Sequence, residues 1–482
     1  MWSAAESFFA RLGEFGPHIA LAEGERTLTY AEMLGAVAAR GRHLRALGAH
    51  RVALALDNGI DWVLWDLAAL HAGLVCVPVP GFFSADQQRH VLDSAGIDCL
   101  IGNGAPGFAN VEANIHRRTV AHPTALHANT CKITYTSGTT GQPKGVCLDL
   151  ATQLAVADSL VKASASRAVE RHLCILPLAT LLENIAGVYA PLLAGARVEL
   201  MPMAQIGLSG ASGFDLMLFL QALQAAQPNS LILLPQLLLS LVSAAEGKLP
   251  VPGSLRFVAV GGGRVSAQLL QRADALGLPI FEGYGLSECA SVVCLNTPEQ
   301  RRVGSTGKPL GHLQVTLAVD GEVLVKGARM LGCLGEPALQ GDWLGTGDLG
   351  HFEDGFLVLH GRKKHQFITA YGRNVNPEWV ESELVQQLPI AQAWLHGEAL
   401  PANVAVLVPR FPNTPDAQLQ AAVDAVNHGL PDYARVHRWL RADAPFNASN
   451  DLATANGRLR RTALFNHYQA AIEALMAEGV HA

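Results

Sequence analysis

The sequence has few charged residues and lacks the patterns of nucleic-acid-binding, secreted or membrane-spanning proteins. Only 16% of its 482 residues are charged, and the formal net charge of −6 arises without a long run of one sign. We therefore expect no nucleic-acid partner and no basic membrane patch. Polar residues and prolines interrupt the apolar stretches, so no membrane span is expected. The first residues lack a basic segment followed by an apolar run, so no secretory signal is expected.

Cysteine is present, but without the spacing of a metal or redox site. The eight cysteines are scattered and form no C-x-x-C pair. Most lie in apolar stretches, where a reduced thiol packs as a small hydrophobic side chain. This usage predicts a cytoplasmic protein. Half of the residues are apolar, so the chain can bury a large core, and its length allows two or three compact units.

Strand-like and helix-like segments alternate through roughly the first 280 residues. Short apolar segments at 52–56, 171–177, 230–235 and 256–260 are strand-like and are separated by longer stretches that include helical patterns. Such alternation predicts an α/β fold with mostly parallel sheets covered by helices on both faces.

The pattern changes in the last third of the chain. From about residue 303, short segments with frequent glycines predict antiparallel strands of a small barrel-like unit. After Arg362, helices mix with short strands, which predicts a smaller, mobile α+β domain. We place the boundary in the charged segment that starts at Arg362, so that residues 1–361 form the N-terminal domain and residues 362–482 the C-terminal domain.

The strongest local signal is the segment 134–146, which reads TYTSGTTGQPKGV. Glycines let backbone N–H groups approach an anion, hydroxyls add donors, and a lysine adds positive charge. The spacing is not that of the P-loop, GxxxxGK[ST]. The ordered spacing favours a triphosphate-binding loop over a solvated surface turn. Its candidate phosphate-binding residues are Thr136, Ser137, Gly138, Thr139, Thr140, Gly141 and Lys144.

This loop resembles the signature of the adenylate-forming (AMP-binding) superfamily, which includes acyl-CoA synthetases, stand-alone adenylation domains and firefly-type luciferases. Further segments resemble the family in the expected order over nearly the whole chain. The resemblance implies that ATP and Mg²⁺ bind between the two domains, and that Lys144 takes part in catalysis. It also implies that Thr139 and Glu288 hold the magnesium ion, a hard cation that favours oxygen ligands.

Two further segments resemble the adenine side of the family's nucleotide site. The segment VGGGRV contributes Gly261, Gly262 and Gly263, whose flat backbone would border the adenine. The segment EGYGLSE implies that Tyr284 and Gly285 pack on the adenine and that Ser287 bonds the α-phosphate. A glycine cluster alone is usually just a tight turn.

Three segments near and after the boundary resemble the family's ribose and hinge motifs. In Thr346-Gly347-Asp348, the resemblance implies that Asp348 accepts hydrogen bonds from both ribose hydroxyls, a task that suits a carboxylate. In the segment GRKK, Arg362 would also reach the ribose and Lys364 would be the hinge. In the segment YGRNVN, Gly372 would line the narrow channel for a pantetheine thiol.

One departure from the family concerns the C-terminal catalytic lysine. Arg458 stands in its place, and no lysine follows Lys364 in the sequence. Arginine keeps the charge but presents a planar fork where lysine presents a compact ammonium. We expect Arg458 to serve as the catalytic cation, while a half-active or inactive homologue that binds acyl-adenylate remains an alternative.

These features predict an acid–thiol ligase that forms an acyl-adenylate and passes the acyl group to coenzyme A or to phosphopantetheine. The segments 181–196 and 371–381 resemble long-chain fatty acyl-CoA synthetases, so a medium- or long-chain fatty acid is the expected small-molecule substrate. A stand-alone amino-acid or aryl-acid adenylating enzyme is the alternative. An acyl carrier protein is a possible partner.

Overall fold

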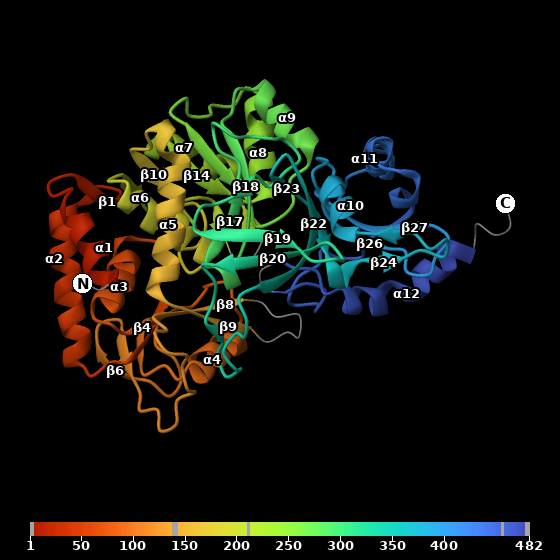
Figure 1. The fold of residues 1–482 in the computed structure, drawn as a ribbon. Coiled ribbons are helices and arrows are strands. Elements are labelled where there is room, and N and C mark those ends of the chain that lie inside the picture. The colour runs from red at the N-terminus through yellow and green to blue at the C-terminus, as the bar shows by residue number, and fades with distance from the viewer. Residues whose placement is uncertain (1–3, 137–142, 210–212, 455–456, 478–482) are drawn as a thin grey trace.

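The computed structural model describes residues 4–136, 143–209, 213–454 and 457–477. A large N-terminal part, built of mixed sheets and helices, lies beside a smaller C-terminal part (Figure 1). The prediction of an α/β fold with a large and a small domain is confirmed. The boundary between residues 361 and 362 remains a prediction.

The largest sheet brings the segments that alternate with helices into one layer. Over the described residues it has nine strands in the order β18-β17-β16-β15-β14-β10-β11-β1-β2, and the pairs from β16 to β1 are parallel. Parallel strands point their carboxyl ends to the same edge, where ligands bind in open α/β sheets. The strands are β1 (Ile19–Glu23), β2 (Arg26–Thr29), β10 (Arg171–Leu173), β11 (Arg197–Glu199), β14 (Ser230–Leu233), β15 (Phe257–Val260), β16 (Ile280–Leu286), β17 (Ser291–Leu295) and β18 (Lys308–Pro309).

A second mixed sheet carries the strand that leads into the hydroxyl-rich segment. Counted over the same described residues, its eight strands run in the order β21-β9-β8-β4-β3-β5-β7-β6. Strands β8 and β9 form an antiparallel pair, and Thr136 lies opposite Lys144 where they meet the segment 137–142. The strands are β3 (Arg51–Ala55), β4 (Val75–Pro78), β5 (Cys99–Gly102), β6 (Ala109–Glu112), β7 (Ile115–Arg117), β8 (Lys132–Thr136), β9 (Lys144–Leu148) and β21 (Gly332–Cys333).

The helices begin where the sequence supplies capping side chains. Thr29 accepts the N–H of Glu32, and the Glu32 carboxylate accepts the N–H of Thr29 in return, which starts α2. Ser84 and Gln87 form the same reciprocal pair at the start of α4. The helices of the N-terminal part are α1 (Ala4–Gly13), α2 (Tyr30–Ala46), α3 (Ile60–His71), α4 (Ala85–Ser94), α5 (Leu150–Ser164), α6 (Ala190–Leu193), α7 (Leu216–Ala226), α8 (Pro235–Glu246), α9 (Ala267–Ala275) and the π-helix η2 (Glu183–Tyr189).

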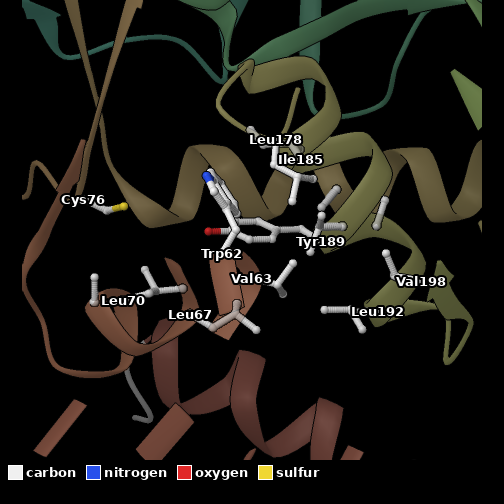
Figure 2. Close-up of a cluster of buried hydrophobic side chains, with 14 of the residues drawn as sticks. Trp62, Val63, Leu67, Leu70, Cys76, Leu178, Ile185, Tyr189, Leu192 and Val198 are labelled. Atoms are coloured by element: carbon white, nitrogen blue, oxygen red, sulfur yellow. The ribbon is translucent and has the colours of Figure 1, made fainter. Parts of the chain in front are cut away.

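The core of the N-terminal part packs aromatic side chains between helices. Trp62 of α3 and Tyr189 of η2 are almost fully buried and point into one cluster with Val63, Leu67 and Ile185 (Figure 2). Beside this cluster, Lys132 Nζ lies 2.9 Å from Asp66 Oδ1. Both side chains are buried, and the Tyr189 hydroxyl donates to Asp66 at 2.7 Å. This polar group ties β8 to α3 and η2.

The later segments form smaller antiparallel and mixed units. The expected antiparallel strands after residue 303 are present as a sheet in the order β19-β20-β22-β23. The C-terminal part has its own core, with α10 and α11 on one side of the sheet β26-β27-β28 and α12 on the other. These elements are β19 (Leu313–Leu317), β20 (Glu322–Gly327), β22 (Leu344–Glu353), β23 (Phe356–Arg362), β24 (Phe367–Ile368), β25 (Asn374–Val375), α10 (Pro377–Val385), β26 (Ile390–His396), β27 (Asn403–Pro409), α11 (Asp416–Gly429), β28 (Val436–Arg441) and α12 (Arg461–Ala477).

Within the part of the chain that the structure describes, none of the helices combines the length and apolar character needed to cross a bilayer. Cytoplasmic location remains a prediction.

Candidate active site

A cavity of about 1010 Å³ lies where the N-terminal part faces the C-terminal part. Its walls come from the carboxyl ends of β14 and β15, from β16 and β17, and from the C-terminal segment around residue 458. The structure thus brings together predicted site residues from sequence positions almost 200 residues apart. Those that line the cavity are Gly261, Gly262, Gly263, Tyr284, Gly285, Ser287 and Arg458.

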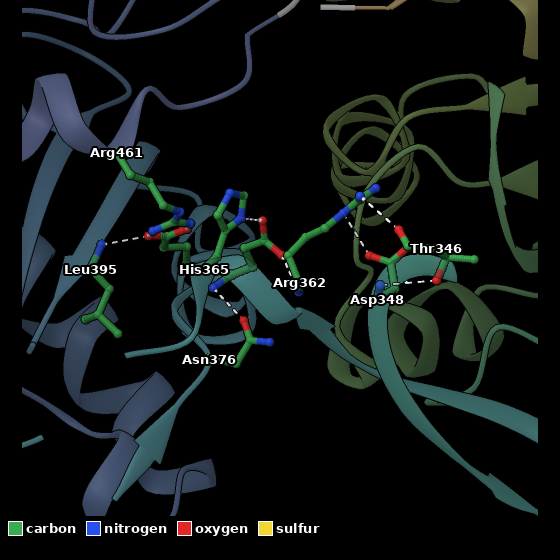
Figure 3. A network of polar contacts seen from close by, with 9 residues as sticks. Thr346, Asp348, Arg362, His365, Asn376, Leu395 and Arg461 are labelled. Atoms are coloured by element: carbon green, nitrogen blue, oxygen red, sulfur yellow. Dashed lines mark hydrogen bonds and ion pairs between the residues drawn. The ribbon is translucent and has the colours of Figure 1, made fainter. Parts of the chain in front are cut away.

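A carboxylate–guanidinium–phenol group lies next to this cavity. The Tyr284 hydroxyl donates to Asp348 Oδ2 at 2.6 Å, and Arg362 Nε lies 2.8 Å from Asp348 Oδ1. Asp348 and Arg362 are cross-strand partners on β22 and β23, which explains why they meet. Figure 3 shows the Arg362 side chain pointing toward Asp348 and Thr346. Burial raises the pKa of Asp348, while Arg362 and Tyr284 act in the opposite direction.

Ser287 and Glu288 follow Tyr284 in a short 3₁₀ turn, Ser287–Cys289. Both side chains are half-buried. The Glu288 carboxylate forms no hydrogen bond or ion pair with any residue that the structure describes. Because no described residue bonds either oxygen of this half-buried carboxylate, both oxygens can bind a cation. The chemistry of this group therefore fits the predicted magnesium ion.

Arg458 reaches the same region from the C-terminal part. Its backbone N–H donates to the Thr454 hydroxyl at 3.0 Å, while its side chain lines the cavity. Loss of bulk solvation and the charge of Arg362 lower the pKa of its guanidinium, whereas Glu288 and Asp348 act in the opposite direction. These couplings place Arg458 within electrostatic reach of the predicted metal and ribose residues.

The hydroxyl-rich segment is brought to this region only in part. Ser137, Gly138, Thr139, Thr140 and Gly141 lie outside the described residues. Thr136 ends β8, and Lys144 begins β9. Lys144 does not line the cavity, and its ammonium is 3.1 Å from Glu336 in an exposed ion pair. Its predicted catalytic contact therefore requires this exposed pair to open, which is energetically cheap.

Gly285 has a structural reason to be glycine that does not involve a nucleotide. A Cβ at this position would lie 1.6 Å from the backbone oxygen of Ser291 on the neighbouring strand β17. Gly262 adopts a φ of +75°, a conformation that side chains other than glycine rarely tolerate. The glycine segment can therefore make its sharp turn at the end of β15, directly on the cavity wall.

The predicted hinge and thiol-channel residues lie outside the cavity. Lys364 is exposed in the turn Lys363–His365, and among the described residues it has no ion pair, whereas Lys363 pairs with Glu322 at 3.1 Å. Gly372 is also exposed, has a φ of +72°, and does not line the cavity. The described conformation therefore presents Arg458, and not Gly372, to the cavity.

Sequence reasoning missed two acidic side chains of α10 that bond other segments of the C-terminal part. Glu378 accepts the backbone N–H of Arg362 at 3.2 Å and contacts His365 Nδ1 at 2.6 Å. Burial opposes ionisation of this carboxylate, but its contact with His365 keeps the pKa of Glu378 below the ordinary value. Glu381 binds Arg461 with both oxygens, at 2.9 and 2.6 Å (Figure 3). The one sequence signal near this network is the charged segment that starts at Arg362 and includes His365.

Comparison with known proteins places the chain in a family. Residues 8–344 match the AMP-binding enzyme family, and residues 364–479 match the AMP-binding enzyme C-terminal domain. The chain belongs to the AMP-binding enzyme family. The predictions of an enzyme, of the acid–thiol ligase class, and of ATP, Mg²⁺ and coenzyme A as ligands are confirmed at the level of this family.

The chain is similar to proteins named as ligases of aromatic acids. It is 27% identical over 410 residues to a 2-succinylbenzoate–CoA ligase of Bacillus mycoides (strain KBAB4), covering 78% of this chain and 81% of the relative. A 2-succinylbenzoate–CoA ligase of Bacillus cereus (strain AH820) is 28% identical and covers 77% of this chain and 81% of the relative.

Solved structures share the fold over nearly the whole chain. The anthranilate CoA ligase AuaEII in complex with anthranoyl-AMP has a TM-score of 0.82 at 20% identity, covering 98% of both chains. O-succinylbenzoate coenzyme A synthetase (MenE) from Bacillus subtilis, in complex with ATP and magnesium ion, has a TM-score of 0.74 at 23% identity, covering 94% of this chain and 98% of the other. The finer prediction of a long-chain fatty acyl type is not supported by these names.

Proposed function

We propose that the protein activates an aryl carboxylic acid with ATP and transfers the acyl group to the thiol of coenzyme A. The observation that carries this proposal is the convergence of Tyr284, Ser287 and Arg458 on one cavity, with Asp348 and Arg362 bonded to Tyr284 at its edge.

The carboxylate–guanidinium–phenol group is suited to a ribose. Each Asp348 oxygen already accepts one hydrogen bond, from Arg362 or from Tyr284. A carboxylate has about four acceptor sites, so roughly two remain for the adjacent hydroxyls of a ribose. The ring of Tyr284 lines the cavity together with the glycine segment 261–263, which leaves a flat surface for the adenine.

Glu288 is the residue proposed to hold magnesium, together with Thr139 from the segment outside the described residues. When bound, the metal ion would neutralise phosphate charge and orient the leaving pyrophosphate. The protein itself contributes the cavity, the ribose contacts and the fixed donors. Ser287 would donate to the α-phosphate from its half-buried position beside Tyr284.

In the first step a carboxylate oxygen of the acid attacks the α-phosphorus of ATP, and the bond to pyrophosphate breaks. Arg458 lines the cavity, and it would contact both the attacking carboxylate and the α-phosphate and stabilise the negative charge that develops there. No general base is needed, because the nucleophile is already ionised. Positioning and electrostatic stabilisation supply the catalysis.

In the second step the thiolate sulfur of coenzyme A attacks the acyl carbon, and AMP leaves. Because Gly372 is exposed outside the cavity, this step needs another arrangement of the C-terminal part. We propose rotation at Lys364, an exposed residue whose ammonium is not bound in an ion pair within the described structure. Rotation would withdraw Arg458 and bring the Gly372 loop to the site.

The aryl substrate is supported by the names of the relatives and by the inner part of the cavity. We define this inner arm by the lining residues of α5, η2, α6 and the first halves of β10, β14 and β15. Across the described residues the inner arm contains no lysine or arginine side chain, so it does not favour a second carboxylate on the acid. Its lining residues are Leu160, Val161, Ser164, His172, Ala186, Ala190, Pro191, Ser230, Leu231 and Phe257.

The proposal is tested by mass spectrometry of products formed from ATP, Mg²⁺, coenzyme A and a panel of acids. We expect AMP and aryl-CoA thioesters from benzoic or cinnamic acids, with lower kcat/KM for fatty acids. Higher kcat/KM for medium- or long-chain fatty acids would restore the expectation drawn from the sequence. Release of phosphate and ADP, with no AMP, would exclude adenylation altogether.

A further inference from the structure

Two polar side chains of the inner arm, and a third buried behind them, have no part in the chemistry described above. His172 of β10 and Ser230 of β14 line the cavity and are 3% and 5% exposed. Glu183 of η2 is fully buried behind them. His172 Nδ1 is 2.8 Å from the Ser230 hydroxyl, and His172 Nε2 is 3.4 Å from Glu183 Oε1. They form a hydrogen-bonded chain from Glu183 to the cavity wall.

The surroundings of Glu183 show that it acts as an acceptor. The backbone N–H of Leu176 donates to its other oxygen at 3.3 Å. Burial, followed by the charge of Glu183 and a hydrogen bond to it, raises the pKa of the Cys174 thiol far above its ordinary value, so this thiol stays protonated beside the carboxylate. Gly187 provides the space that the Glu183 carboxylate occupies, because a Cβ there would lie 2.5 Å from Glu183 Oε1. Each described neighbour that contacts the Glu183 carboxylate through a polar group therefore presents a hydrogen-bond donor to it.

This acceptor selects the tautomer of His172. Its Nε2 must carry hydrogen in order to donate to Glu183. The contact of 3.4 Å is longer than a charge-assisted N–H···O bond, which is usually about 2.7–2.9 Å. In a neutral imidazole the other nitrogen, Nδ1, is an acceptor. Ser230 must then donate its hydroxyl hydrogen to His172. The lone pairs of the Ser230 oxygen can then accept a hydrogen bond from a ligand.

Ser230 lies at the far end of the arm from the nucleotide residues. It is the first residue of β14 and pairs with Phe257, whereas Leu233 pairs with Val260, directly before the glycine segment. Three residues of strand span roughly 10 Å. A group that meets Ser230 is therefore distant from the carboxylate that reacts at the carboxyl ends of the strands.

We propose that Ser230 is a specificity-determining residue that accepts a hydrogen bond from a hydroxyl or amino group at the far end of the acyl group. His172 is its positioning residue, held by Glu183. This inference rests on the proposed function, since it names the substrate class for the same site. The Ser164 hydroxyl, which also lines the arm, donates to Leu160 of its own helix at 3.1 Å. The rest of the wall around His172 and Ser230 is apolar, so an acid without such a donor leaves the Ser230 acceptor unsatisfied in the closed site.

The test compares kcat/KM for cinnamic acid with its 4-hydroxy, 4-amino and 4-methoxy derivatives. For the wild-type protein we expect the two donor-bearing acids to exceed cinnamic acid and its methoxy derivative by about 10-fold. In Ser230→Ala this ratio should fall to near one, because the far end of the acyl group then meets no hydroxyl acceptor.

Ser240→Ala is the matched control, because Ser240 also lines the cavity but its hydroxyl donates to Gln236 of its own helix at 3.0 Å. It should keep the wild-type ratio. His172→Gln should lower the ratio as well, whereas a merely structural role would change kcat/KM for all four acids alike and leave their ratio unchanged.

Equal kcat/KM for all four acids, or a preference for the methoxy derivative, would overturn the inference while leaving the proposed function intact. A wild-type protein that forms no thioester with any acid would refute the proposed function instead. Elemental analysis provides a further check, since His172, Cys174 and Glu183 lie close enough to hold a metal ion. Stoichiometric metal that is lost in His172→Gln would overturn the hydrogen-bond assignment.

Discussion

Glu282 begins the segment that carries Tyr284 and Ser287, and its burial makes the stability of the protein depend on pH. Its side chain is 6% exposed, and its Oε2 has no hydrogen-bond partner in the described structure. Burial raises the pKa of Glu282 from 4.5 to about 8, against the charges of Arg264 and Arg301. The folded protein therefore keeps a proton that the unfolded chain releases above pH 4.5.

The sign and size of the effect follow from this difference. Stability from the protonated Glu282 is fully present below pH 4.5 and is lost as the pH rises toward 8. Between these values the folded state holds one more proton, so the free energy of unfolding falls by about 1.4 kcal/mol per pH unit. In Glu282→Gln this contribution is absent, because the amide does not titrate.

Urea denaturation of the wild-type protein and of Glu282→Gln at pH 5.5, 6.2 and 7.0 measures this contribution. We expect the wild-type protein to lose about 2 kcal/mol relative to the variant across this range. Glu14→Gln, at an exposed position, is the surface control and should run parallel to the wild type. Parallel curves for the wild-type protein and Glu282→Gln would refute the argument, since Glu282 would then ionise as freely as it does in the unfolded chain.

Three further changes test the framework of the site. Lys132→Met leaves Asp66 buried without its ion pair and should lower the free energy of unfolding by about 3–5 kcal/mol. In thermal denaturation, the double variant Lys132→Met/Asp66→Asn should recover part of this loss. Gly285→Ala places a Cβ against the backbone of β17 and should lower Tm by several degrees, whereas an unchanged Tm would contradict the close approach. Tyr284→Phe removes a hydrogen bond to a charged group, Asp348, and should raise the KM for ATP by about 10-fold; an unchanged KM would separate Asp348 from nucleotide binding.

The sequence alone was sufficient to predict the positions of strands that are apolar on both faces. The expected strand at 52–56 is observed as Arg51–Ala55, and that at 230–235 as Ser230–Leu233. Fully buried parallel strands have this continuous apolar pattern. Strand β16, Ile280–Leu286, runs through two glycines. Glycine weakens strand propensity, but here the close approach of β17 requires it, and that approach is set by tertiary structure.

Long-range polar pairs were beyond the reach of sequence reasoning. Asp66 and Lys132 are 66 residues apart, and their burial depends on the packing of α3 against β8. His172 and Glu183 are likewise joined only by the geometry of η2. The acid substrate was also out of reach, because an apolar pocket wall and an ordinary core have the same composition.

The predicted nucleotide residues came from the family resemblance, and the structure brings a good part of them together. Tyr284, Asp348 and Arg362 meet, and Arg458 reaches the same region from the other side. Lys144 is instead paired with Glu336. Strand register explains the meeting of Asp348 and Arg362, which no reading of local sequence patterns could supply.

Acid-dependent exchange of labelled pyrophosphate into ATP tests most directly whether Arg458 is the cation of the first step. We expect the wild-type protein to catalyse exchange with an aryl acid, and the exchange rate to fall by about 10²–10³-fold in Arg458→Ala. Arg458→Lys should retain substantial exchange activity. Arg438→Ala is the control, because this arginine lies outside the cavity lining. Undiminished exchange in Arg458→Ala, or no acid-dependent exchange in the wild-type protein, would contradict the account.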